Sequence, residues 1–197
     1  MPVYTLFGQP ASPVGLTVDS SGYTMGVQFS SSQPGTITAI WFFSPPGAVS
    51  LPNQIGLFQV TGPGTGTLVA SQAPSWSGAA GSGWVRAPFT TPPAISAGSN
   101  YKACILDNAG SNFYGATANY WATSGVTSGP LTAPNNAGGD GGQDTFTSPS
   151  PGLLYPATSF NASNYWVDLE LTTTAAGPVM VPGGDYERSR LRRELIW

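Results

Sequence analysis

Of the 197 residues, 40% are hydrophobic and 12% are aromatic, so the chain can bury the core of one ordinary domain, and disorder throughout is excluded. Only 8% are charged, while 26 glycines and 19 prolines interrupt the sequence every few residues, which excludes a helical protein. The net charge is −3, yet before the last ten residues Arg86 and Lys102 are the only basic residues, which argues against a nucleic-acid partner.

Short apolar or alternating segments, separated by turns that contain Gly and Pro, predict β-strands along most of the chain. They lie at residues 4–7, 24–29, 36–43, 53–60, 67–70, 84–89, 100–106 and 113–114. The pair 53–60 and 67–70 is predicted to form a hairpin. Strict alternation within 36–43 would place Ile37 and Phe42 on opposite faces. About eight short strands at this spacing predict an all-β fold, an antiparallel β-sandwich or jelly roll.

The interval 123–156 is rich in Gly, Pro and Asn and has no clear period. A loop of this length in a compact domain is either functional or packed as an Ω-like excursion. Within it, Asp140 and Asp144 flank two glycines and a glutamine, and they offer the oxygen ligands that Ca²⁺ prefers. The spacing is not that of a regular calcium loop, so a plain turn is the default interpretation and Ca²⁺ the alternative.

The stretch 159–171 predicts the closing strand of the domain. From Tyr165 onward its residues alternate, with Val167, Leu169 and Leu171 on the face of Tyr165. The opposite face carries Trp166, Asp168 and Glu170.

Little in the sequence supports catalysis or a cofactor. There is no histidine, and no nucleophile elbow, phosphate-binding loop or dinucleotide fingerprint is present. Asp168 and Glu170 could approach each other, but glycosidases draw their two carboxylates from opposing elements across a cleft. We interpret the pair as part of a solvated strand face, and we predict that the chain is not an enzyme.

The remaining signals concern location and redox state. Cys104 lies in a strand-like run and is predicted to be a buried small hydrophobe rather than a nucleophile. The N-terminus has no basic region followed by an apolar run, so no secretory signal is predicted. No stretch of 18 apolar residues occurs, so no membrane span or membrane partner is predicted.

After residue 174 the character of the sequence changes, and we divide the chain into a sandwich domain at 1–174 and an arm at 175–197. Asp185 could cap a short helix over 186–195, with its arginines placed late, as the helix dipole prefers. Such a helix is marginal alone in water and would expose an apolar end. We therefore predict a docking arm, with a solvated terminus as the alternative. Its predicted docking residues are Tyr186, Arg188, Arg190, Leu191, Arg192, Arg193, Leu195, Ile196 and Trp197.

Several segments resemble a bacterial domain family of unknown function. The most specific are GPLTAP at 129–134 and FNASNYWVD at 160–168, and shorter matches lie at 4–7, 26–29, 35–40, 83–84, 93–98 and 101. The resemblance covers about residues 4–171 and leaves out the arm. It implies a β-sandwich of the carbohydrate-binding-module type, a domain that recurs in large actinobacterial surface or polysaccharide-associated proteins. The resemblance implies a fold but assigns no activity, because the family has none that is agreed and a fold alone does not establish a function.

Two functions follow as expectations. An extracellular-type domain that has a docking arm but no export signal suggests a bacteriophage virion protein, such as a capsid decoration or minor tail protein. Such a protein would contact other virion proteins or copies of itself, and it would be released by lysis. The alternative is a carbohydrate-binding module that recognises a surface glycan. Sugar rings stack on exposed aromatic rings, and the aromatic residues in or beside loops are Trp76, Tyr114, Tyr120 and Trp121.

Overall fold

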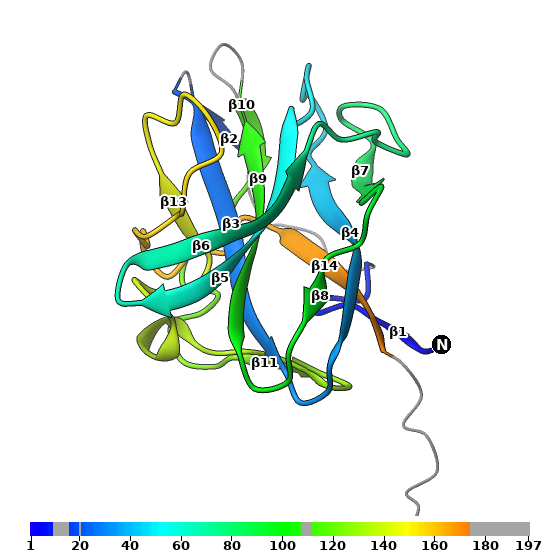
Figure 1. Cartoon of the computed structure of the whole chain (residues 1–197). Coiled ribbons are helices and arrows are strands. Elements are labelled where there is room, and N and C mark those ends of the chain that lie inside the picture. Colours follow the sequence, from blue (N-terminus) through cyan, green and yellow to red (C-terminus); the bar gives the residue numbers. More distant parts are fainter. Residues whose placement is uncertain (10–15, 20, 108–111, 174–197) are drawn as a thin grey trace, which may run out of the picture.

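The computed structural model describes residues 1–9, 16–19, 21–107 and 112–173. In this part the chain forms two main antiparallel sheets that pack face to face, so the predicted all-β sandwich is confirmed (Figure 1). The first sheet runs in the order β1-β14-β4-β7, and β8 also pairs with β4. Its strands are β1 (Val3–Tyr4), β4 (Gly35–Ser44), β7 (Gly83–Pro88), β8 (Ala94–Ile95) and β14 (Val167–Thr173).

The second sheet runs in the order β11-β12-β3-β9-β5-β6, and β13 pairs with the first half of β3. Its strands are β3 (Tyr23–Ser31), β5 (Gln54–Gly62), β6 (Thr65–Gln72), β9 (Asn100–Asp107), β11 (Val126–Ser128), β12 (Leu131–Ala133) and β13 (Thr145–Thr147). A separate two-stranded ladder joins β2 (Leu16–Asp19) to β10 (Asn112–Gly115). The predicted hairpin is confirmed as β5 and β6.

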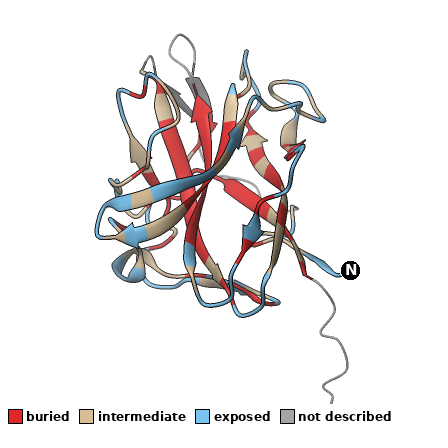
Figure 2. Ribbon diagram, viewed as in Figure 1, coloured by how far each residue is buried: buried red, intermediate tan, exposed pale blue. Residues whose placement is uncertain are grey.

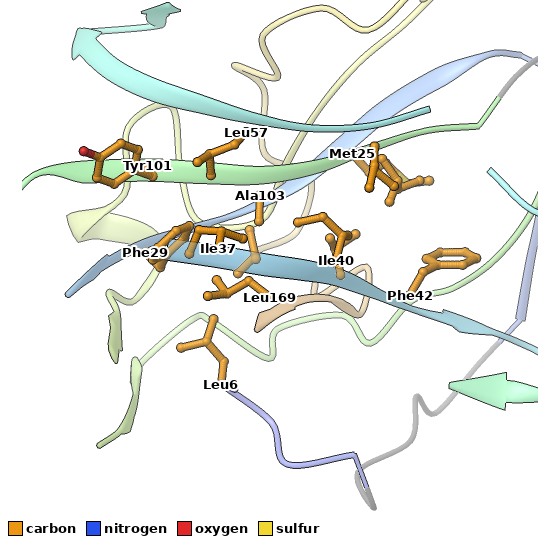
Figure 3. Packing of buried hydrophobic residues seen from close by; sticks show 14 of the residues in the cluster. Leu6, Met25, Phe29, Ile37, Ile40, Phe42, Leu57, Tyr101, Ala103 and Leu169 are labelled. Atoms are coloured by element: carbon orange, nitrogen blue, oxygen red, sulfur yellow. The ribbon is translucent and has the colours of Figure 1, made fainter. Parts of the chain in front are cut away.

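The core lies between the two sheets, because alternate residues of each strand point inward. The second sheet contributes residues such as Met25, Phe29 and Leu57, and the first contributes Ile37 and Leu169 (Figure 3). All five are buried. Figure 2 shows the burial concentrated in the central strands, whereas the outward edge of β6 is exposed.

A β-bulge in β4 breaks the alternation that the sequence predicts there. Ile37 pairs with Leu171 and Ala39 pairs with Glu170, so Thr38 is the extra residue. The bulge turns Ile37 to the same core as Ile40 and Phe42. The prediction that Ile37 and Phe42 lie on opposite faces is therefore wrong.

The two ends of the described domain are joined by a buried carboxylate. The predicted strand 4–7 is shorter than expected, since β1 ends at Tyr4. The backbone N–H groups of Leu6 and Phe7 instead donate to the carboxylate of Asp168, at 2.9 and 3.0 Å. Asp168 thus takes the place of a partner strand for the N-terminal segment.

The closing strand also begins later than the alternation suggested. β14 starts at Val167, and Trp166 before it has a left-handed backbone (φ 56°). Tyr165 and Trp166 are both buried, although alternation would place them on opposite faces of one strand. The turn at Trp166 sends the two rings to different aromatic clusters.

The interval 123–156 is a packed excursion, and it contains β11, β12, β13 and the short 3₁₀ helix η1 (Asn136–Gly138). Its second half covers the outer face of the second sheet. There the buried ammonium of Lys102 donates to the carbonyls of Asp140 and Pro156 and to the Thr145 hydroxyl, at 2.7 to 2.9 Å. Gln143 adds a reciprocal pair of bonds to the backbone of Gln28. This polar layer explains how a segment without period can be ordered.

No helix in the described part of the chain is long and apolar enough to cross a membrane. Cys104 is buried, as predicted. The predicted docking arm lies outside the described residues, so its helix, its nine docking residues and the boundary at 174 stay predictions.

Candidate functional site

The aromatic residues predicted to bind glycan lie in three different places. Trp121 is fully buried (0% exposed) and offers no free ring face to a sugar, so it cannot serve as the predicted platform. It belongs to a packing cluster made of Phe7, Trp84, Tyr120, Trp121 and Trp166. Tyr120 is half-buried in the same cluster, 4.8 Å from the ring of Trp121 and 5.4 Å from that of Trp166. These rings join the N-terminal segment to the closing strand.

Trp76 lies at the edge of the core. Its indole N–H donates to the carbonyl of Pro52 at 2.8 Å, and its ring centroid is 6.3 Å from that of Phe42. It is half-buried and attaches its loop to the sandwich. The rings of Trp76 and Tyr120 thus pack against other aromatic side chains of the domain.

Tyr114, by contrast, lines a pocket of about 550 Å³. This volume lies in the range of small-molecule sites. The pocket is formed by the start of β3, by β10 and the loop after it, by β13, and by the segment before β14. Its lining residues are Tyr23, Met25, Tyr114, Ala116, Ala118, Phe146, Phe160, Asn161, Ser163 and Tyr165.

Four of the lining rings form a closed cycle, which we call the aromatic box: Tyr23, Tyr114, Tyr165 and Phe146. Going round the cycle, neighbouring centroids are 6.1, 5.7, 6.2 and 5.8 Å apart. The ring planes meet at 58° to 85°, as the walls of a box do. Each ring comes from a different segment, so only the assembled fold creates the box.

Hydrogen bonds hold the box residues in place from behind. The backbone N–H of Tyr165 donates to the buried carboxylate of Asp144 at 2.6 Å. Phe146 exchanges two backbone bonds with Thr158, at 2.8 and 3.1 Å, in addition to its pairing with Met25 on β3. The walls are therefore anchored to the sandwich and need little ordering when a ligand binds.

The rim of the pocket is exposed and conformationally unusual. Phe160 is 62% exposed, and the next two residues, Asn161 and Ala162, both have left-handed backbones (φ 51° and 46°). Their carbonyls accept from the N–H groups of Asn119 and Trp121, which holds the turn in that form. Strained backbone of this kind gathers at ligand sites.

Two buried carboxyls neighbour residues of the box. Asp144 bonds to Tyr165, and Asp107 is the residue opposite Tyr23 in the β3–β9 ladder. Burial raises the pKa of both carboxyls to about 7. For Asp144, the Tyr165 N–H and the nearby Trp121 indole oppose that shift, although the indole lies outside strict hydrogen-bond geometry. Burial, together with the nearby Asp144, Tyr114 and Tyr23 side chains, also raises the pKa of the Tyr165 hydroxyl.

The two predicted calcium ligands act as structural acceptors. Asp140 accepts from the N–H of Gly64 at 2.8 Å and from the Tyr155 hydroxyl at 2.6 Å, and it lies 3.8 Å from the Lys102 ammonium. Asp144 points to Tyr165 instead. The described residues hold no cluster of three or more His, Cys, Asp or Glu side chains that could bind a metal ion.

The prediction that Asp168 and Glu170 lie on a solvated face is wrong for Asp168. Its carboxylate is fully buried and accepts four N–H bonds, from Leu6, Phe7, Leu169 and the side chain of Gln9. Burial raises its pKa to about 6 against the pull of these donors. Glu170 is only partly buried, with 14% of its side chain exposed, and it pairs with Arg86 through two bonds of 2.7 and 2.9 Å, which lower its pKa.

Sequence reasoning thus found one wall of the pocket, Tyr114, and missed Tyr23, Phe146, Phe160 and Tyr165. Alternation places Tyr165 on a strand face, and Phe146 lies in the interval 123–156, which has no clear period. The one available signal is that two aromatic residues, Phe160 and Tyr165, flank the short polar segment 161–164.

The fold and the pocket define a class of protein: a β-sandwich domain with a pocket that is lined by aromatic rings and has the volume of a small-molecule site. The chain belongs to the family described as domain of unknown function DUF4082, whose model matches residues 9–167. This agrees with the resemblance seen in the sequence to a domain family without an assigned activity. No curated protein matches the chain.

Proposed function

We propose that this chain is a non-enzymatic binding domain that holds part of a carbohydrate in the aromatic pocket. The observation that carries the proposal is the composition of the pocket: five aromatic rings, two polar side chains at Asn161 and Ser163, and no charged side chain among the lining residues.

The physical reason is the two-sided chemistry of a sugar. The C–H faces of a pyranose pack on aromatic rings, while its hydroxyls need a few well-placed hydrogen-bond partners. The box supplies the rings, Asn161 supplies donors and acceptors at the exposed rim, and the buried Ser163 adds a hydroxyl to the lining. The resemblance of the sequence to polysaccharide-associated domains supports the same ligand class.

The exposed ring of Phe160 offers a direct test. Replacing Phe160 by Ala removes a rim ring that is 62% exposed, so binding should weaken while stability changes little. Val49→Ala is the matched control, because Val49 is 68% exposed and is not a lining residue. Binding would be measured with a glycan array and then by calorimetry on the best ligand. A chain that binds no glycan, or a Phe160→Ala variant with unchanged affinity, would overturn the proposal.

A second role, assembly into a virion, is supported by the arm at 175–197, with its four arginines and its apolar end. In this role the domain is displayed on a particle and the arm docks on neighbouring subunits. Deleting residues 177–197 should leave a folded domain, because all described contacts lie at or before Thr173, and this domain should no longer be incorporated. Sedimentation of the producing culture's lysate tests the role, since recovery only as a monomer of about 20 kDa would refute it.

A further inference from the structure

The geometry of the aromatic box suits a compact positive charge. Neighbouring centroids of the four rings lie 5.7 to 6.2 Å apart, and all four residues line the same pocket. The centre of a square with that edge is about 4 Å from each centroid, within the distance of about 6 Å over which a cation is attracted to an aromatic ring. A single ammonium group could therefore contact several rings at once.

The charges around the pocket favour a cation in the same way. Residues 1–173 contain six carboxylate side chains and two basic ones, a formal net charge of −4. Both bases are engaged elsewhere: Arg86 pairs with Glu170, and Lys102 is buried under the excursion. Among the described residues no basic side chain lines the pocket, so no fixed positive charge there repels a cation. The carboxyl of Asp144 accepts from the backbone N–H of Tyr165, and Asp107 pairs with Tyr23 across the β3–β9 ladder. Because burial raises the pKa of both carboxyls to about 7, they add negative charge near the pocket only as the pH rises through that value.

We infer that the aromatic box recognises an ammonium group on the glycan, either the free amine of an amino sugar or a quaternary amine attached to the sugar chain. The inference rests on the proposed function, because it takes the pocket as the binding site. The exposed Asn161 side chain at the rim would then contact the sugar that carries the amine.

The test compares pairs of probes that differ in charge. Choline is matched with its neutral isostere 3,3-dimethyl-1-butanol, and glucosamine is matched with N-acetylglucosamine. Calorimetry should show the charged member of at least one pair binding tenfold more tightly or better, since cation–π contacts in a desolvated site are worth about that much. Preference within the choline pair points to a quaternary substituent, and preference within the glucosamine pair points to an amino sugar.

Two variants test whether the preference for the charged probe arises in the aromatic box. Phe146→Leu removes one half-buried wall and should weaken binding of the charged probe about tenfold. Tyr120→Leu is the control, because Tyr120 is a half-buried ring of the packing cluster and should leave the affinity unchanged. If Phe146→Leu fails to fold, the comparison of the probe pairs on the unaltered chain still decides.

The possible failures can be told apart. Equal affinities within both pairs would overturn the ammonium inference, and so would binding of neutral glycans alone, which leaves the carbohydrate proposal standing. If neither the charged probes nor any glycan binds, both proposals fall.

Discussion

Replacing Asp168 by Asn tests whether this buried carboxylate joins the N-terminal segment to the closing strand. Asparagine keeps one oxygen, which can still accept from Leu6 and Leu169. The bonds from Phe7 and Gln9 are lost, because an NH₂ group takes the place of the second oxygen. A bond to a charged acceptor contributes about 1.5–3 kcal/mol, and the amide recovers part of the loss because it buries no charge. We expect a net loss of about 3 kcal/mol at pH 7.

For a chain of this length, such a loss lowers the melting temperature by about 6–12 °C. The assay is thermal and urea unfolding of the full chain, with Glu170→Gln as the control on the same strand. The side chain of Glu170 is 14% exposed, and the glutamine variant keeps an oxygen that can accept from Arg86 or Thr38, so its loss should be smaller, about 1 kcal/mol. A loss for Asp168→Asn no larger than that of the control would refute the reasoning.

The pH dependence of the same variant tests the cause of the pKa shift. Burial raises the folded-state pKa of Asp168 from 3.8 to about 6, so protonation stabilises the folded protein, and that stabilisation is lost as the pH rises through about 6. The difference in unfolding free energy between the unaltered chain and Asp168→Asn should narrow by about 2 kcal/mol from pH 4 to pH 7. If this difference in stability widens with rising pH instead, the four N–H donors would lower the pKa of Asp168 by more than burial raises it.

Three further predictions follow from other buried groups. Lys102→Met should lower the free energy of unfolding by about 2–4 kcal/mol and expose residues 139–158 to proteolysis, because the excursion loses its three ammonium bonds; unchanged protease resistance would contradict this. Trp121→Ala should cost about 3–5 kcal/mol in urea unfolding, as expected for a fully buried ring, and glycan binding lost without a loss of stability would contradict that role. Burial raises the folded-state pKa of Asp107 and Asp144 to about 7, so protonation of these two carboxyls stabilises the folded chain. That stabilisation is full below pH 4 and is lost as the pH rises to about 7, so the melting temperature should be lower at pH 8 than at pH 5. A melting temperature that does not change with pH would refute this.

The sandwich could be predicted from the sequence because its signals are local. Alternating residues in the strands that became β3, β4, β5 and β9, with Gly and Pro between them, are properties of short segments. The same local logic failed at Thr38 and Trp166. A bulge and a left-handed residue each change which face a side chain takes without changing the composition.

The candidate site was only partly predictable for a related reason. Sequence reasoning ranked aromatic residues by their nearness to loops, and this measure cannot separate Tyr114, which lines the pocket, from Trp121, which is fully buried. The box needs rings from four segments that are up to 142 residues apart, Tyr23 and Tyr165 being the extremes. No local window contains that information.

The sequence by itself determined the class of structure: an all-β domain with a core between two sheets, followed by an arm of different composition. Strand periodicity and turn residues act over a few residues, so they can be read without the fold. The tertiary structure decided what the polar and aromatic residues do. Asp168, Lys102 and Tyr165 gain their roles from partners distant in sequence, because burial and long-range hydrogen bonds exist only once the sheets have packed.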